Sequence, residues 1–320
     1  MSGKAPTVRD VARAAGVSIA VVSYAFNRPD RVAPATRERV LAAAAALGYP
    51  GPHAAGRALR LGRHGAVALV GLGSTEALLG DPAAALVARG LARVCDRAGH
   101  ALLLAANPSG GADGTVVLGD ARSWSGGGPA VVVGGPAPEG VPCVRARLGE
   151  GAAGAARHLA GLGHARLAVI GPPGTGERLE GAREGWGTAG AFVSYEAAGP
   201  ARADGEAAAR VALGARPRPT ALLALTDRLA WGALDAARRL GVEVPRELSV
   251  AGIDDLAGSE ATRLTSVFVP YLPMGELAGG LLAALMAGGP LPPAPPLPTT
   301  LAVRGTTAPP PGPEPMTRSS

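Results

Sequence analysis

Residues 171–178, with the sequence GPPGTGER, come close to spelling a catalytic motif. They follow an apolar run typical of a strand and nearly match the glycine-rich loop that binds nucleotide phosphates. Glu177 stands where that loop requires a lysine, and a carboxylate at this place would repel the phosphates. We therefore predict that the chain is not an enzyme.

Cysteine and histidine do not form a metal site in the sequence. Cys95 and Cys143 lie far apart without CxxC spacing, and the five histidines are scattered. His158 and His164 flank a predicted helix end, and we interpret both as surface or capping groups. We expect neither a metal nor another cofactor, and two such cysteines fit a reducing cytoplasm.

Basic residues are concentrated at the start of the chain. The 320 residues carry a formal net charge of +6. Residues 1–64 hold ten basic and three acidic residues, a net charge of +7, which leaves −1 for the remainder. A basic segment on a near-neutral body predicts an acidic partner, such as nucleic acid, at the N-terminal end.

The basic segment reads as two short helices joined by a tight turn. Thr7 and Asp10 have the spacing of a capping box, so we expect a helix to begin near Val8. Gly16 suits the residue that ends it, and Ser18 can cap a second helix through IAVVSYAF. The pattern predicts a helix-turn-helix, for which a small helical cap without a ligand is the alternative.

A third helix is predicted from Pro34 through TRERVLAAAAALGY, with Gly48 as its stop. Ala33 replaces a better capping residue before it. From Gly65 on, short apolar runs alternate with Ala-rich helical stretches: GAVALVGLG, PAAALVARGLARVCDRAGH and ALLLAAN come first. Strand, helix and strand in this order indicate parallel βαβ units and a doubly wound α/β body.

Nothing in the sequence indicates export or a membrane. The first residues, MSGKAPTVRD, lack the apolar core of a signal peptide, and no apolar run reaches the ~18 residues of a membrane span. We expect a cytoplasmic protein without a membrane partner.

Residues 7–63, TVRDVARAAGVSIAVVSYAFNRPDRVAPATRERVLAAAAALGYPGPHAAGRALRLGR, closely resemble the headpiece and hinge of the LacI/GalR family of bacterial transcriptional repressors. HLAGLGHARLAVIGPP and RELSVAGIDD in the body resemble the same family. The resemblance implies a small all-α helix-turn-helix domain followed by a two-lobed, doubly wound parallel-sheet domain of the periplasmic-binding-protein type. It divides the chain into a headpiece (1–50), a hinge helix and linker (51–64), an effector-binding and dimerisation domain (65–308) and a disordered Pro-rich tail (309–320).

The resemblance also implies which residues meet DNA. Ile19, Ala20 and Tyr24 fall on the positions that touch base edges in the major groove. Arg57 and Leu59 fall on the hinge, where a leucine wedges into the minor groove. Residues better suited to phosphate contacts or capping are Thr7, Ser18, Ser23, Asn27 and Arg28.

Candidate effector residues lie after strands of the body. Arg178 and Asp254 match family effector positions, and Asp227 matches the aspartate of an Asn-Asp pair. Arg147 replaces a usual aspartate and favours an anionic ligand. A loop cap or salt bridge is the alternative for each.

The resulting hypothesis is a repressor, associated with the nucleoid. Its homodimer would bind a pseudo-palindromic operator in double-stranded DNA. A small-molecule effector in the interlobe cleft, either a sugar, a nucleoside or an anionic metabolite, would shift lobe closure and hinge spacing. The alternatives are a solute-binding protein with a helical appendage and an effector-independent regulator with a degenerate pocket.

Overall fold

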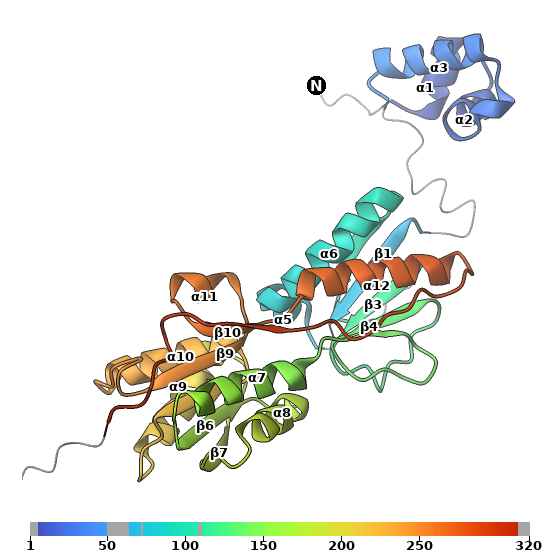
Figure 1. The fold of residues 1–320 in the computed structure, drawn as a ribbon. Coiled ribbons are helices and arrows are strands. Elements are labelled where there is room, and N and C mark those ends of the chain that lie inside the picture. Colours follow the sequence, from blue (N-terminus) through green and yellow to red (C-terminus); the bar gives the residue numbers. More distant parts are fainter. Residues whose placement is uncertain (1–5, 50–63, 72, 108–110, 313–320) are drawn as a thin grey trace, which may run out of the picture.

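The computed structural model describes residues 6–49, 64–71, 73–107 and 111–312 (Figure 1). Arg57 and Leu59 of the predicted hinge helix lie outside these described residues. The described residues form a helical headpiece and two lobes, each built on one mostly parallel sheet. This arrangement confirms the predicted fold class.

Local hydrogen bonds define the first helix ends of the headpiece. Thr7 N–H and its hydroxyl both donate to Oδ2 of Asp10, at 2.9 and 2.6 Å. Ser18 Oγ accepts from the N–H of Val21 at 3.3 Å. Gly16, between the two helices, has φ +64°, a left-handed conformation that glycine adopts without steric penalty. The elements are α1 (Val8–Ala15), α2 (Ile19–Asn27), the 3-10 helix η1 (Pro29–Arg31) and α3 (Pro34–Ala46).

The apolar faces of these helices form one small core. Ala33 offers α3 no side-chain cap, as predicted, and Pro34 occupies the first turn instead. The rings of Phe26 and Tyr49 meet edge to face at a centroid distance of 6.2 Å. The buried members of this core are Val11, Ala12, Ala15, Val22, Ala25, Val40, Ala44 and Tyr49.

The N lobe has a five-stranded parallel sheet in the order β2-β1-β3-β4-β5. In this sheet Leu69 lies opposite both Leu104 and Val116. The helices α6 and α12 pack on one face, and the loops 119–129 and 134–142, the first of which includes Trp124, cover part of the other. The elements are β1 (Ala66–Gly71), α5 (Thr75–Gly80), α6 (Pro82–Ala98), β2 (Ala101–Ala105), β3 (Gly114–Leu118), β4 (Ala130–Val133), β5 (Cys143–Val144) and α12 (Tyr271–Met286).

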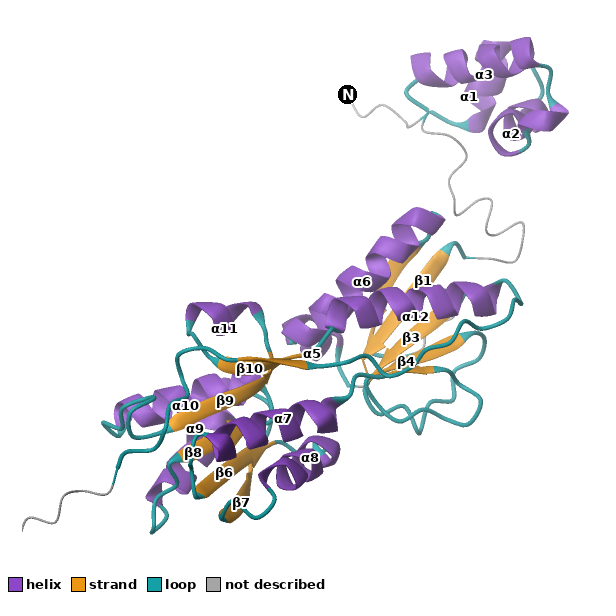
Figure 2. Cartoon of the chain, viewed as in Figure 1, coloured by secondary structure: helices purple, strands orange, loops and turns teal. Residues whose placement is uncertain are grey.

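The C lobe has a six-stranded sheet in the order β11-β10-β9-β8-β6-β7, in which only β11 is antiparallel to its neighbour. Helices α7 and α8 cover one face of this sheet, and α9 and α10 cover the other (Figure 2). Its strands are β6 (Arg166–Gly171), β7 (Ala191–Glu196), β8 (Ala221–Ala224), β9 (Ser249–Asp254), β10 (Thr265–Phe268) and β11 (Thr300–Ala302). Its helices are α7 (Leu148–Gly161), α8 (Gly176–Trp186), α9 (Arg202–Gly214), α10 (Asp227–Arg239) and α11 (Ala257–Ala261).

The chain crosses between the lobes at three places. It passes from β5 to α7 through residues 145–147, from β10 to α12 through 269–270, and back to β11 through 287–299. Two crossings are joined by backbone hydrogen bonds, because Arg147 N–H donates to Leu297 O at 2.9 Å and Leu297 N–H to Arg145 O at 2.8 Å. The body therefore has the two lobes that the family resemblance implies.

The helices α6 and α12 approach each other closely through glycines. A Cβ added to Gly90 of α6 would lie 2.1 Å from the carbonyl oxygen of Leu272, and one added to Gly275 of α12 would lie 2.1 Å from that of Val87. Neither backbone leaves room for a side chain at these two positions. Across the described residues, no helix is both long and apolar enough to cross a bilayer.

One interpretation from the sequence is wrong. His164 is neither a surface nor a capping group, since only 2% of it is exposed. Its Nδ1 lies 3.0 Å from Thr220 Oγ1, and its Nε2 lies 3.0 Å from both Ser249 Oγ and Ala308 O. The ring therefore joins the amino ends of β8 and β9 to Ala308, near the end of the described residues.

Candidate functional sites

Helix α2 presents apolar side chains to solvent on one side. Val22 and Ala25 on its inner side are 0% and 1% exposed, whereas Ile19 and Tyr24 on its outer side are 46% and 41% exposed. Ala20 is exposed next to them. The three residues predicted to touch bases thus lie on a free helix face whose opposite face is anchored in the core.

The other residues predicted to contact DNA have partners nearby in the sequence or lie outside the described part of the structure. Ser18 is exposed while its hydroxyl caps α2, and Thr7 is exposed while it bonds to Asp10. Arg28 is exposed and ends α2, its N–H donating to Tyr24 O at 2.8 Å. Ser23 is half-buried with an interaction of its own. The side chain of Asn27 is outside the described part of the structure.

Three side chains from both lobes meet at Asp254, the last residue of β9. The hydroxyl of Tyr271, which begins α12 in the N lobe, donates to Asp254 Oδ1 at 2.5 Å. Nη1 of Arg178, in the first turn of α8, lies 3.6 Å from the same oxygen and donates to Leu225 O at 2.5 Å. Asp254 has φ +127°, a strained backbone conformation that residues other than glycine rarely adopt. The structure thus brings Arg178 and Asp254 together, as their assignment to one site requires.

Burial dominates the electrostatics of this cluster. It raises the pKa of Asp254 to about 6, although the Arg178 charge and the Tyr271 hydrogen bond act to lower it. Burial, followed by the charge of Asp254, also raises the pKa of Tyr271 well above its ordinary value. At neutral pH the phenol therefore remains a donor, and the carboxylate is close to its titration range.

Asp227 lies deeper than a ligand contact would require. It is 0% exposed. Its Oδ1 accepts from Ser266 Oγ at 2.5 Å, and its Oδ2 accepts from Ser259 Oγ at 2.5 Å and from Leu256 N–H at 2.8 Å. Burial raises the pKa of this carboxyl group. These bonds tie α10 to the segment after β9, which fits the capping alternative better than the ligand role.

Arg147 and Glu177 lie where α7 and α8 begin. Arg147 is half exposed, and its guanidinium donates to Pro296 O at 3.3 Å and to Glu150 Oε2 at 3.4 Å, so it turns toward the crossing segments. Glu177, the residue in the place of the phosphate-loop lysine, accepts from Gly149 N–H at 3.2 Å through its Oε1. The glutamate thus connects the starts of the two helices.

A cavity of about 280 Å³ opens at the carboxyl ends of β6 and β7, beside the cluster of Asp254, Arg178 and Tyr271. Ligands of parallel-sheet proteins sit at such strand ends. Leu225, whose carbonyl binds Arg178, belongs to its wall. Tyr195 lines the cavity and Tyr271 reaches Asp254. Neither tyrosine was predicted as a site residue, because no motif in the sequence marks them. The lining residues are Val169, Gly171, Pro172, Pro173, Gly174, Thr175, Gly176, Leu179, Ser194, Tyr195, Glu196 and Leu225.

The chain is similar to known proteins along nearly its whole length. Residues 7–50 match the family of bacterial regulatory proteins, lacI family, and residues 156–307 match a periplasmic binding protein-like domain. The HTH-type transcriptional regulator Rv3575c of Mycobacterium tuberculosis is 35% identical, with 95% of this chain and 97% of that protein covered. The HTH-type transcriptional regulator CelR of Thermobifida fusca is 32% identical, with 88% and 92% covered.

Solved structures give the same result for the fold. The transcriptional regulator CelR in complex with cellobiose is 30% identical with a TM-score of 0.66, covering 94% of this chain and 99% of that one. The lac repressor dimer bound to operator and an anti-inducer has a TM-score of 0.81 at 23% identity, covering 95% and 100%. The second likeness concerns the fold alone.

Proposed function

The chain belongs to the lacI family of bacterial regulatory proteins, and from this premise we propose that it is a repressor whose homodimer binds a pseudo-palindromic operator through α2. A two-fold symmetric protein matches a two-fold symmetric site. Because a bacterial regulator of chromosomal DNA acts in the cytoplasm, the proposal includes a cytoplasmic location. The binding of an effector between the lobes would then change operator affinity.

The exposed face of α2 carries the DNA-binding half of the proposal. Ile19 and Ala20 offer apolar contact, which suits thymine methyl groups, and Tyr24 adds one hydroxyl. A free apolar face on a helix that is anchored on its other side is a surface for a partner. The basic headpiece supplies attraction to phosphates without sequence preference.

The cluster around Asp254 carries the effector half. Asp254 already accepts a hydroxyl, that of Tyr271, so it can accept a hydroxyl from a ligand in the same way. Arg178 beside it suits a hydroxyl or a carboxylate. The relative CelR was solved with cellobiose. We therefore propose a small polyhydroxylated ligand, such as a sugar. Because Tyr271 and Arg178 already engage Asp254 within the chain, an effector-independent regulator is the second candidate.

DNA binding is tested by fluorescence anisotropy with the intergenic DNA beside the gene, at several salt concentrations. We expect tight binding, with an association constant whose logarithm falls linearly with the logarithm of the salt concentration. Tyr24→Ala and Ile19→Ala should weaken binding to this DNA by about tenfold each, on the scale of ~1–3 kcal/mol for a base contact. Val211→Ala, at a body residue that is 65% exposed, is the matched control. Binding that is indifferent to sequence or to both headpiece variants would contradict the proposal.

The effector is tested by calorimetry with sugars, nucleosides and organic acids on the full chain. For the compound that binds, Arg178→Ala should abolish the heat of binding. Operator binding without that compound should be unchanged in this variant. An active compound whose affinity survives Arg178→Ala would place the effector elsewhere.

A further inference from the structure

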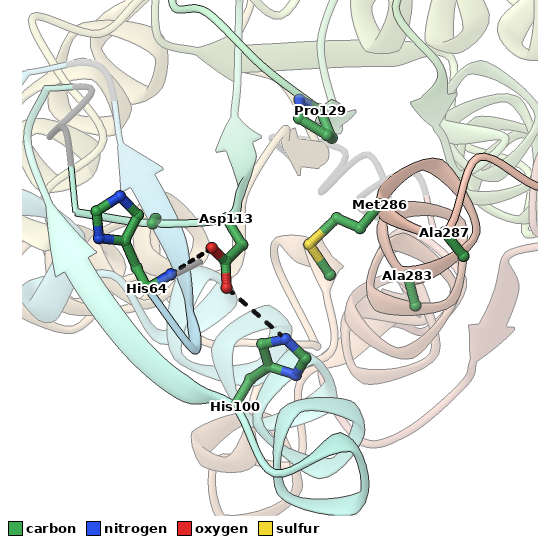
Figure 3. Close-up of a pocket in the computed structure, with 8 residues that line it drawn as sticks. His64, His100, Asp113, Pro129, Ala283, Met286 and Ala287 are labelled. Atoms are coloured by element: carbon green, nitrogen blue, oxygen red, sulfur yellow. Dashed lines mark hydrogen bonds and ion pairs between the residues drawn. The ribbon is translucent and has the colours of Figure 1, made fainter. Parts of the chain in front are cut away.

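A second cavity lies at the opposite end of the N lobe, where the body begins. Its volume is about 400 Å³, within the range of small-molecule pockets. It opens at the amino ends of the parallel strands, whereas the Asp254 cluster lies at the carboxyl end of β9. The residues that line it are His64, His100, Ala112, Asp113, Pro129, Ala283, Met286 and Ala287 (Figure 3).

Asp113 forms the polar wall of this cavity. Its Oδ1 accepts from His64 N–H at 2.6 Å, and its Oδ2 accepts from Gly65 N–H at 2.7 Å. Nε2 of His100 lies 4.0 Å from Oδ2, beyond hydrogen-bond distance. A carboxylate has about four acceptor sites, so Asp113 keeps capacity for further donors. It is the only formally charged side chain among the lining residues.

The opposite wall is apolar and comes from the end of α12. Ala283, Met286 and Ala287 face the histidines and Asp113 across the cavity, with Pro129 on a third side (Figure 3). A methionine side chain is polarizable, adapts its shape and makes favourable contacts with aromatic rings. The cavity therefore offers an anionic acceptor on one wall and a soft apolar surface on the other.

We propose that this cavity is a second ligand site, for a small amine or amidine with a compact apolar or aromatic body. The cationic nitrogen donates to Asp113 beside His100, and the body lies against Met286 and the two alanines. A charge-assisted hydrogen bond of this kind is stronger than a neutral one. The same wall disfavours carboxylates, because a second anion beside Asp113 would be repelled.

The position of the site gives it a role in regulation, and this step rests on the proposed function. Asp113 binds His64, the last residue of the predicted linker, and Gly65, the first residue of the body. Its apolar wall is the C-terminal end of α12, whose first residue is Tyr271. At 1.5 Å per residue, the 16 residues of α12 span about 24 Å. One rigid helix thus connects the second site to the Asp254 cluster.

The binding test uses benzylamine on the full chain, with benzyl alcohol and benzoate as neutral and anionic probes of the same shape. Ligand-observed NMR should give a dissociation constant on the order of 1 mM for benzylamine, as expected for a ligand of this size. Benzyl alcohol should bind at least about tenfold more weakly and benzoate more weakly still. Asp113→Asn should reduce benzylamine affinity about tenfold.

A filling variant keeps the test decisive if Asp113→Asn disturbs folding. Ala283→Leu adds bulk to the apolar wall and should abolish benzylamine binding, whereas Gly280→Ala, on the same helix with nothing near its added Cβ, should bind as the natural chain does. Three outcomes would each overturn the proposal. Benzoate could bind as tightly as benzylamine, or benzylamine could fail to bind at a concentration 10-fold above the expected dissociation constant. The third is an unchanged benzylamine affinity in Ala283→Leu. Operator affinity measured with and without benzylamine then tests the regulatory step separately from binding.

Discussion

Tyr271 and Asp254 join the two lobes through one hydrogen bond of 2.5 Å, from the phenol of the N lobe to a carboxylate oxygen of the C lobe. The same oxygen lies 3.6 Å from the guanidinium of Arg178. A ligand hydroxyl that binds this oxygen must either share it with the phenol or displace the phenol. The contact therefore joins the lobes in the ligand-free chain and competes with a ligand for the same oxygen.

Tyr271→Phe should remove this hydrogen bond while keeping the ring. Because a hydrogen bond to a charged group contributes about 1.5–3 kcal/mol, we expect urea unfolding of the body to show a loss of this size. Exchange of the Val269 and Tyr271 amides, on either side of Pro270 in this crossing, should become faster. Tyr195→Phe, at the nearby cavity, is the control. Unchanged stability and unchanged exchange in Tyr271→Phe would show that the contact does not hold the lobes.

Asp254 should make the body less stable as pH rises through 6. Its pKa is raised from 3.8 to about 6 in the folded chain, so between these values the folded state binds more protons than the unfolded one. Stability from this group is fully present below pH 3.8 and is lost by pH 6, by up to about 3 kcal/mol. Asp254→Asn should lack this component when unfolding free energies are compared from pH 4 to pH 7. A constant difference between the two proteins over that range would contradict the shift.

His164 should act in the opposite direction. Burial lowers its pKa, against the hydrogen bond to Ala308 O, so the folded state resists protonation. Its contribution to stability is present above the ordinary value of 6.5 and is lost as pH falls below it. The melting temperature should fall more between pH 7 and pH 5 in the natural chain than in His164→Gln. The exposed His64, replaced by Gln, should leave the drop unchanged.

Two glycines of α12 should respond to alanine with opposite signs. At Gly275 the added Cβ would meet Val87 O at 2.1 Å, so α6 and α12 must separate and the body should lose several kcal/mol. At Gly280 the Cβ meets nothing within 4 Å, and alanine should stabilise the helix by up to about 1 kcal/mol. Thermal unfolding of both variants measures the pair. Equal effects at the two positions would mean that the contact between α6 and α12 is looser than described.

Local signals predicted the headpiece well. The capping residues Thr7 and Ser18 and the left-handed Gly16 mark helix ends through contacts within a few residues, which a sequence shows directly. Elements without such a signal were not identified: β7 has only two half-buried residues among exposed ones, and α8 contains many charged residues. Strands were identified where burial on both faces produces a continuous apolar run, as in β1 and β6.

The effector cluster was only partly predictable, because part of it depends on chain crossings. Arg178 and Asp254 lie after strands of one sheet, where shared strand ends bring them together. Tyr271 reaches them from the other lobe, and no spacing in the sequence encodes that contact. The burial of His164 has the same cause, since its partners Ser249 and Ala308 are distant in sequence.

The pairing of two crossings has a mechanical consequence. Ala146 and Leu297 form a parallel bridge, flanked by the hydrogen bonds between residues 145–147 and Leu297. Two bonded segments resist torsion about their common length, since twisting would break the bonds, yet they bend together at little cost. We therefore expect the lobes to move more readily by bending across this ribbon than by twisting about it.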